Sequence, residues 1–124
     1  MSKINLIYIL ICLLFSACAE DDNLVANSCG VTNPVEQLPW LKASIQDLEK
    51  NRNDPTYKYF YISQGVYENQ VVFILGNCCP FCNTITPVRN CEGELLFYKS
   101  SENLDKILSE QALWLPVGND CNFI

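Results

Sequence analysis

The stretch "TYKYFYISQGVYENQVVFIL", residues 56–75, predicts two consecutive strands of a β-sheet. Thr56–Ser63 is rich in aromatic residues that alternate along the chain, which is typical of a strand. Gln70–Leu75 is apolar almost throughout and predicts a buried strand. A turn near Glu68 and Asn69 separates the two segments by so few residues that we expect them to pair antiparallel.

The first of these strands carries a row of tyrosines. Side chains alternate between the two faces of a strand, so Tyr57, Tyr59 and Tyr61 are expected on one face. Such a row is more often an amphipathic sheet face that is covered at one end, and a contact surface for carbohydrate or protein is the alternative. The sequence leaves both interpretations open.

Two further strands and a short helix are predicted downstream. Thr84–Asn90 predicts a third strand, in which Pro87 has no N–H to donate and belongs on an edge or at a bulge. Asn90–Gly93 has turn chemistry, and Glu94–Lys99 predicts a fourth strand. Ser100–Gln111 opens with a serine cap and predicts a short C-terminal helix. The expected inner stripe of that helix is Leu104, Ile107 and Leu108.

The segment upstream, Val35–Arg52, predicts the first helix, with Pro39 in its first turn and Trp40 packed beneath its start. Its apolar stripe steps by 3, 4 and 3 residues. Residues 34–124 therefore predict a single disulfide-stapled α+β domain with an N-terminal helix, a four-stranded antiparallel meander and a short C-terminal helix. The helices are expected on one face of the sheet. The stripe of the first helix is Leu38, Leu41, Ile45 and Leu48.

Between the second and third strands lies "GNCCPFCN", residues 76–83, which contains a C-x-x-C motif from Cys79 to Cys82 filled by proline and phenylalanine. This filling is found in glutaredoxins, and the preceding strand resembles the approach to the motif in the thioredoxin fold. That fold places a long helix after the motif. Here the following segment is β-branched and broken by Pro87 and Gly93. An envelope thiol–disulfide oxidoreductase using Cys79 and Cys82 is therefore an alternative interpretation.

The sequence contains no histidine, which excludes Ser-His-Asp and Cys-His catalysis and His-ligated zinc. Four-cysteine zinc sites usually take two C-x₂-C knuckles, and only one is present. Exported chains meet an oxidising compartment in which cysteines form disulfides. We therefore expect no catalytic residue, no metal and no cofactor. The candidates for disulfide bonds are Cys29, Cys78, Cys79, Cys82, Cys91 and Cys121.

Six cysteines allow fifteen connectivities, and geometry reduces that number. Cys82 and Cys91 lie at opposite ends of the predicted third strand, roughly 25 Å apart, which is too far for a bond. Cys91 should therefore pair with Cys29 or Cys121, and the other of those two should take one loop cysteine. The remaining loop cysteines then form one of two pairs, Cys79–Cys82 or Cys78–Cys82.

The N-terminus has the pattern of a secretory signal, because Lys3 precedes the apolar run Ile4–Phe15 and two small residues. That run is shorter than the roughly 20 apolar residues of a transmembrane helix. "LFSAC", residues 14–18, resembles the lipobox of bacterial lipoprotein precursors. The resemblance implies a signal peptide over residues 1–17 and a diacylglyceryl group on Cys18, which would become the first residue of the mature chain.

Residues 18–33 are expected to form an acidic tether. Glu20, Asp21 and Asp22 resemble the surface-export signal of Bacteroidota lipoproteins, and a solvated spacer is the other interpretation. Loss of Lys3 with the signal changes the formal net charge from −6 to −7. An acidic chain repels nucleic acid and anionic lipid headgroups, so attachment to the outer membrane would depend on the lipid.

The chain as a whole resembles small cysteine-containing lipoproteins of Bacteroidota, through "LPWLK", "NCCP" and "NCEGELL". This resemblance implies no activity. The leading hypothesis is a non-catalytic, lipid-anchored binding or accessory domain with a protein or glycan partner. The alternatives are the oxidoreductase and a small enzyme inhibitor that presents the cysteine loop. An exposed Phe81 favours the inhibitor, whereas a buried Phe81 favours a purely structural loop.

Overall fold

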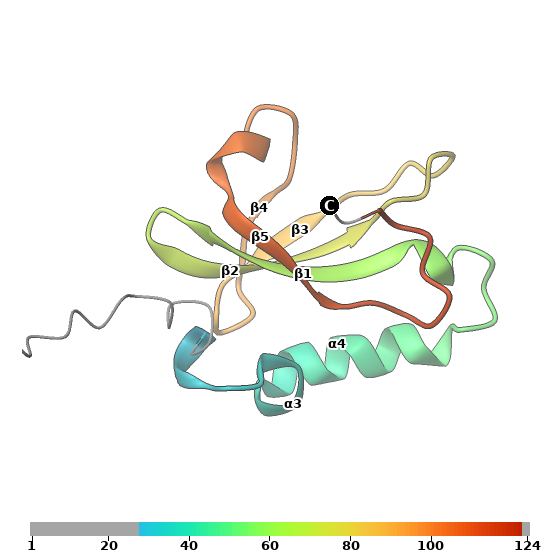
Figure 1. Cartoon of the computed structure of the whole chain (residues 1–124), viewed down its shortest axis with the longest axis horizontal. Coiled ribbons are helices and arrows are strands. Elements are labelled where there is room, and N and C mark those ends of the chain that lie inside the picture. Colours follow the sequence, from blue (N-terminus) through green and yellow to red (C-terminus); the bar gives the residue numbers. More distant parts are fainter. Residues whose placement is uncertain (1–27, 123–124) are drawn as a thin grey trace, which may run out of the picture.

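The computed structural model describes residues 28–122, and the expected signal peptide, Cys18 and acidic cluster lie outside this range. Within it, helices cover one face of a five-stranded sheet whose neighbouring strands are antiparallel, in the order β4-β3-β2-β1-β5 (Figure 1). The α+β class is confirmed, with five strands in place of the expected four. No helix in this part of the chain has the length and apolar character to cross a bilayer. The elements are α3 (Pro34–Gln37), α4 (Pro39–Lys50), β1 (Phe60–Tyr67), β2 (Gln70–Asn77), β3 (Pro87–Arg89), β4 (Leu95–Tyr98) and β5 (Leu108–Trp114).

The β1–β2 hairpin, whose antiparallel pairing the sequence predicts, is at the centre of the sheet because β5 adds beside β1. Tyr67 pairs with Gln70 across a two-residue turn. Glu68 and Asn69 adopt left-handed backbone angles, with φ of 48° and 61°. Positive φ at both positions gives the turn the twist that flanking strands require. The two strands pair over eight residues each, so this hairpin sets the register of the rest of the sheet.

The expected first helix is interrupted at Leu38. Leu38 has an extended backbone, and α4 begins at Pro39. A residue before proline disfavours the helical region, and proline itself is well suited to the first helical position. Leu41 and Ile45 of α4 pack on Ile62 and Phe73 of the sheet and form the main core.

Residues 28–33, expected in the tether, belong to the folded domain. Cys29 and Val31 pack against the helix-side core, and Cys29 is bonded to Cys91. The indole N–H of Trp40 donates to the Cys91 carbonyl at 2.8 Å, and the Trp40 ring lies where a Cβ on Gly93 would fall. The N-terminal segment, the start of α4 and the β3–β4 turn therefore meet at one corner of the domain.

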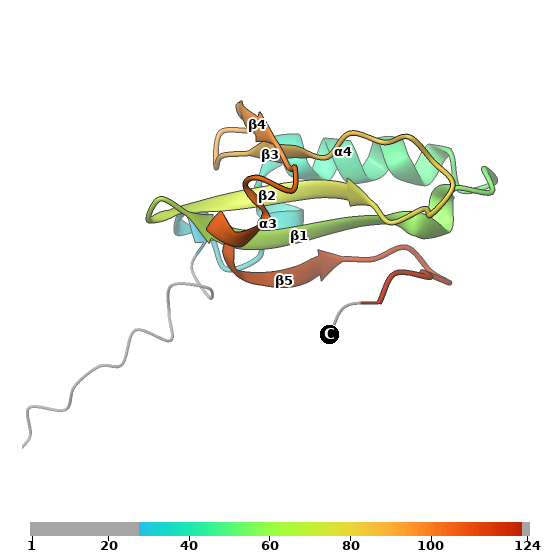
Figure 2. The same ribbon diagram turned by 90° about the horizontal axis from the view of Figure 1, so that it is seen from above.

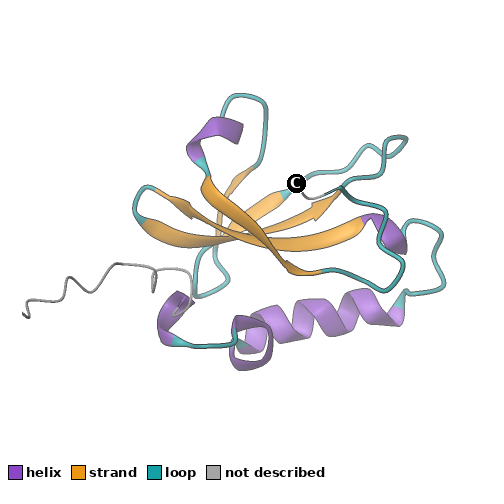
Figure 3. Ribbon diagram, viewed as in Figure 1, coloured by secondary structure: helices purple, strands orange, loops and turns teal. Residues whose placement is uncertain are grey.

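The prediction of a C-terminal helix over Ser100–Gln111 is wrong. Leu104–Lys106 form a single 3₁₀ turn, and β5 follows and pairs with β1 (Figure 3). Of the expected stripe, Ile107 is 7 % exposed, whereas Leu108 is 60 % exposed. The outer edge of β1 offers unpaired backbone groups, and pairing with them outweighs a weak local helix preference.

The segment between β4 and β5 crosses the sheet face opposite α4, because the two strands lie at opposite edges (Figure 2). Ile107 packs there on Val72, Ile74 and Val88. Ile107 has room there because Gly65 lacks a side chain. A Cβ on residue 65 would lie 2.7 Å from Ile107 Cγ2, which is too close. This crossing segment closes the second, smaller core.

The expected tyrosine row does not form. Tyr57–Tyr59 are a 3₁₀ turn that precedes β1. Asp54 initiates it, because its carboxylate accepts the Thr56 N–H at 2.7 Å and its carbonyl accepts the Tyr57 N–H at 3.0 Å. Tyr57 is buried, and its ring meets that of Trp114 edge to face at 6.5 Å. The aromatic contact platform that the sequence left open is therefore absent from this strand.

Candidate functional site: the Cys79–Cys82 loop

Every cysteine in residues 28–122 is in a disulfide, and the expected stapling of the domain is confirmed. The Cα–Cα distances are 5.5 Å for Cys29–Cys91, 5.8 Å for Cys78–Cys121 and 5.3 Å for Cys79–Cys82. This connectivity is among those that the strand geometry leaves open. Over the same residues no group of three or more His, Cys, Asp or Glu side chains is arranged to hold a metal.

The end of β2 fixes the first residues of the loop. The Cys78 N–H donates to the Tyr59 carbonyl at 2.8 Å, which extends the β1–β2 ladder one step beyond Asn77. The Asn77 side-chain oxygen accepts the Cys79 N–H at 2.9 Å. An asparagine that bonds the backbone two residues on forms an Asx turn. The chain is therefore redirected as it leaves the sheet.

The C-terminal segment is held against the same end of the sheet. The Asn119 side-chain amide donates to the carbonyls of Lys58 and Phe60, at 2.9 and 2.8 Å. The Asp120 N–H donates to the Lys58 carbonyl at 3.0 Å, and its carboxylate pairs with Lys58 Nζ at 2.8 Å. These contacts place Cys121 beside the end of β2, where it forms its disulfide.

Cys79 to Cys82 form a closed turn. The Cys82 N–H faces the Cys79 carbonyl at 3.4 Å, and the disulfide joins the same two residues. Pro80 and Phe81 occupy the two central positions, and proline is favoured at the first of them. Phe81 is 89 % exposed. A large aromatic side chain is thus held in solvent by a covalent ring and a rigid proline.

The same end of the molecule carries further exposed apolar side chains. Ile85 is 72 % exposed and Val117 is 97 % exposed, and Leu115 is also exposed. Residues 78–86 and 115–121 both lie at the right-hand end of Figure 1, and the described chain begins at the left-hand end. The exposed apolar loops and the start of the described chain are therefore at opposite ends of the domain's longest axis.

The surroundings of the C-x-x-C motif differ from those of a redox catalyst. A catalytic cysteine requires a lowered pKa, which a helix N-terminus or a neighbouring cation supplies. Residues 83–86 form no helix and lead directly into β3. The cation at the base of the loop is Lys58, and its hydrogen bond and charge pairing with Asp120 raise the pKa of Lys58. Its positive charge is therefore already matched by a carboxylate.

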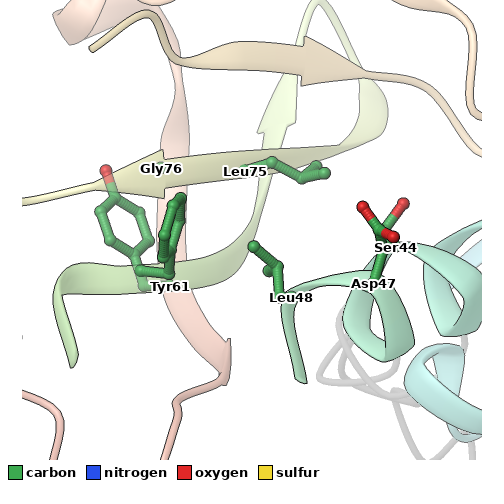
Figure 4. Close-up of a pocket in the computed structure, with 7 residues that line it drawn as sticks. Ser44, Asp47, Leu48, Tyr61, Leu75 and Gly76 are labelled. Carbon is green, nitrogen blue, oxygen red and sulfur yellow. The ribbon is translucent and has the colours of Figure 1, made fainter. Parts of the chain in front are cut away.

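A groove of about 240 Å³ lies between the C-terminal half of α4 and the β1–β2 pair (Figure 4). Leu48 and Leu75 give it apolar walls, and Asp47 and Ser44 lie at one side. The Ser44 hydroxyl donates to the Trp40 carbonyl at 2.9 Å, and Asp47 pairs with Lys50. The two polar side chains that α4 contributes to the groove are thus engaged within that helix.

A polar network under the crossing segment was missed by the sequence analysis. The buried Ser63 hydroxyl donates to Glu110 Oε1 at 2.7 Å, and Lys99 Nζ pairs with Glu110 Oε2 at 2.9 Å. Burial, and secondarily the charge of Glu110, raise the pKa of Tyr61 nearby. Because Ser63 is fully buried, no substrate reaches its hydroxyl, and the network braces the two ends of the crossing segment. No local sequence signal marks it, since Lys99 and Glu110 meet only after the segment between them has crossed the sheet face.

Comparison of this chain with protein-family models, with curated proteins and with solved structures gave no match.

Proposed function

We propose that this chain is a lipid-anchored envelope domain without catalytic activity, which binds a protein partner through Phe81 on the Cys79–Cys82 ring. The exposure of Phe81 carries the proposal. A single exposed apolar residue is ordinary on a protein surface. This one is exceptional because a disulfide and a proline hold it away from the domain.

The ring favours binding for an energetic reason. Burying a phenylalanine side chain in a partner's pocket contributes roughly 1.5–3 kcal/mol. A loop that is already fixed in its bound shape loses less conformational entropy when it binds. Two backbone positions, Pro80 and Phe81, lie inside a ring closed by Cys79 and Cys82. The loop therefore presents the Phe81 side chain in a fixed conformation that suits an apolar pocket.

The position of the loop agrees with an N-terminal anchor. Lipid on Cys18 would lie on the chain before Ser28, and the loop is at the opposite end of the domain (Figure 1). Phe81 would then face away from the anchoring bilayer and towards other proteins. A glycan partner has less support, because the tyrosine row that favoured it does not form.

An inhibitor that occupies a protease active site as a substrate does would require another loop shape. Substrate segments are bound extended, as an added β-strand. The turn from Cys79 to Cys82 is closed by its disulfide and does not extend. An inhibitor with this loop would instead insert Phe81 into a pocket of its target enzyme.

We expect a photo-reactive p-benzoylphenylalanine in place of Phe81 to form a discrete covalent adduct with one envelope protein in the producing cells. The same analogue in place of Glu68, which is exposed on the hairpin turn at the other end of the domain, is the matched control and should form no such adduct. With the captured protein purified, Phe81→Ala should weaken binding about 30-fold, the effect of losing a central aromatic anchor. Identical adduct patterns from the two positions, or none from position 81, would refute the proposal.

A further inference from the structure

The three disulfides differ in how much the fold supports them. Cys29–Cys91 and Cys78–Cys121 join residues 62 and 43 positions apart, whereas Cys79–Cys82 joins residues three apart. A cross-link restricts the unfolded chain more when its loop is longer. Folding and disulfide formation are thermodynamically linked. The free energy by which a disulfide stabilises the fold equals the free energy by which folding stabilises the disulfide. Folding therefore supplies much of the stability of the two long-range bonds, whereas the Cys79–Cys82 bond joins neighbouring residues and depends little on the fold.

Contacts around the sulfur atoms reinforce this difference. If the Cys78–Cys121 bond opened, the Cys78 N–H bond to Tyr59 and the Asn119 bonds to Lys58 and Phe60 would keep the two thiols adjacent. The bond would then reform readily. The Cys91 carbonyl is similarly held by Trp40, at 2.8 Å.

The Cys79–Cys82 ring has little such support. Within the described chain, residues 80–85 contribute a single hydrogen bond, from the Cys82 N–H to the Cys79 carbonyl at 3.4 Å. Pro80 and Phe81 are exposed, and both cysteines are partly exposed, so a reductant has access to the ring. After reduction of the disulfide, only this long hydrogen bond would hold Cys79 and Cys82 in a turn, and the two thiols could separate.

We propose that Cys79–Cys82 is a site of thiol–disulfide exchange with a dithiol reductant, and that its reduction dismantles the loop that presents Phe81. One thiolate of the reductant attacks a sulfur of the ring, and the other ring sulfur leaves as a thiolate and takes up a proton. The second thiol of the reductant then displaces the remaining ring cysteine. The protein gains two electrons and two protons, and the dithiol becomes a disulfide.

Reduction of the ring would affect partner binding, and this part of the inference rests on the proposed function. The closed ring holds Pro80 and Phe81 in a turn, and the reduced segment is free to extend. Phe81 then loses its fixed orientation, and partner binding requires the ordering of a flexible loop. The domain stays folded because Cys29–Cys91 and Cys78–Cys121 remain. The redox state of the compartment would therefore control the contact surface without unfolding the protein.

Two measurements on the purified oxidised protein test this without a partner. In a dithiothreitol titration quenched by alkylation and read by mass spectrometry, Cys79 and Cys82 should become labelled at a concentration about ten-fold below that needed for the other four cysteines, because exposed disulfides have higher reduction potentials than structural ones. Chymotrypsin requires an extended segment and should cleave after Phe81 about ten-fold faster once the ring is reduced. The melting temperature of the ring-reduced form should stay close to that of the oxidised form.

Variants provide the controls. Cys79→Ser with Cys82→Ser should be cleaved after Phe81 without reductant, at the rate of the reduced wild type, and adding Phe81→Ala should remove that cleavage. Reduction of Cys78–Cys121 before or together with the ring, or an unchanged rate of cleavage after Phe81, would overturn the inference. If photo-crosslinking fails and these reduction and cleavage experiments give the expected results, the proposed partner is refuted and the exchange site stands.

Discussion

Replacement of Cys29 and Cys91 together with serine is expected to lower the free energy of unfolding by about 4 kcal/mol, the chain-entropy value for a loop of this length. Their separation in the sequence is 62 residues. Small domains are stable by only about 5–15 kcal/mol, and the two cores here are small. We therefore expect a large part of this variant to be unfolded at physiological temperature.

Local structure adds to that loss. Cys29 has a φ of 60° in the 3₁₀ turn of Ser28–Gly30, and its bond holds this strained turn against the β3–β4 corner. Trp40 reports the corner, because its indole donates to the Cys91 carbonyl. A urea titration followed by tryptophan fluorescence measures the change. Cys79→Ser with Cys82→Ser is the matched control, and its loss should be no more than about 2 kcal/mol. An equal or larger loss in the control would contradict the assignment of the long-range bond as the main staple.

Replacement of Cys18 with alanine is expected to release the protein from the membrane completely. The interpretation of Cys18 as the lipidated residue depends on its place after the lipobox-like Leu14–Ala17. Several acyl chains bind a bilayer durably, because each buried methylene contributes about 0.8 kcal/mol. The formal net charge of −6 disfavours attachment through anionic lipid headgroups.

Membrane fractionation and incorporation of labelled fatty acid measure this effect. Cys12→Ala is the matched control, because Cys12 lies inside the apolar run and would leave with the expected signal peptide. The control should retain both the label and membrane association. A Cys18→Ala variant that sediments with membranes as the wild type does would show that the anchor lies elsewhere.

Features with a local physical cause could be predicted from the sequence. The β1–β2 hairpin follows from alternation and from a turn of two residues that tolerate positive φ. The expected pairing of Cys91 with Cys29 or Cys121 follows from the length of a strand, which separates Cys91 from the loop. The hairpin and the separation of Cys91 from the loop both depend on residues that are close in the sequence.

Features that depend on distant partners could not be predicted. Residues 108–114 form a strand because β1 lies beside them, and nothing within that segment indicates it. Lys99 and Glu110 approach only after the chain has crossed the sheet. For the site, the sequence identified the C-x-x-C motif but left the exposure of Phe81 undecided, because exposure depends on where the end of β2 directs the loop.

The central claim is that the Cys79–Cys82 pair shapes a binding loop and catalyses no redox reaction. Dithiothreitol-dependent reduction of insulin tests it most directly, with a thioredoxin as the active reference. We predict that the wild type and the Cys79→Ser, Cys82→Ser variant both leave the rate equal to that of dithiothreitol alone, because residues 83–86 form no helix and the charge of Lys58 is paired with Asp120. A reductase rate in the wild type that disappears in the variant would contradict the claim and make the protein an oxidoreductase.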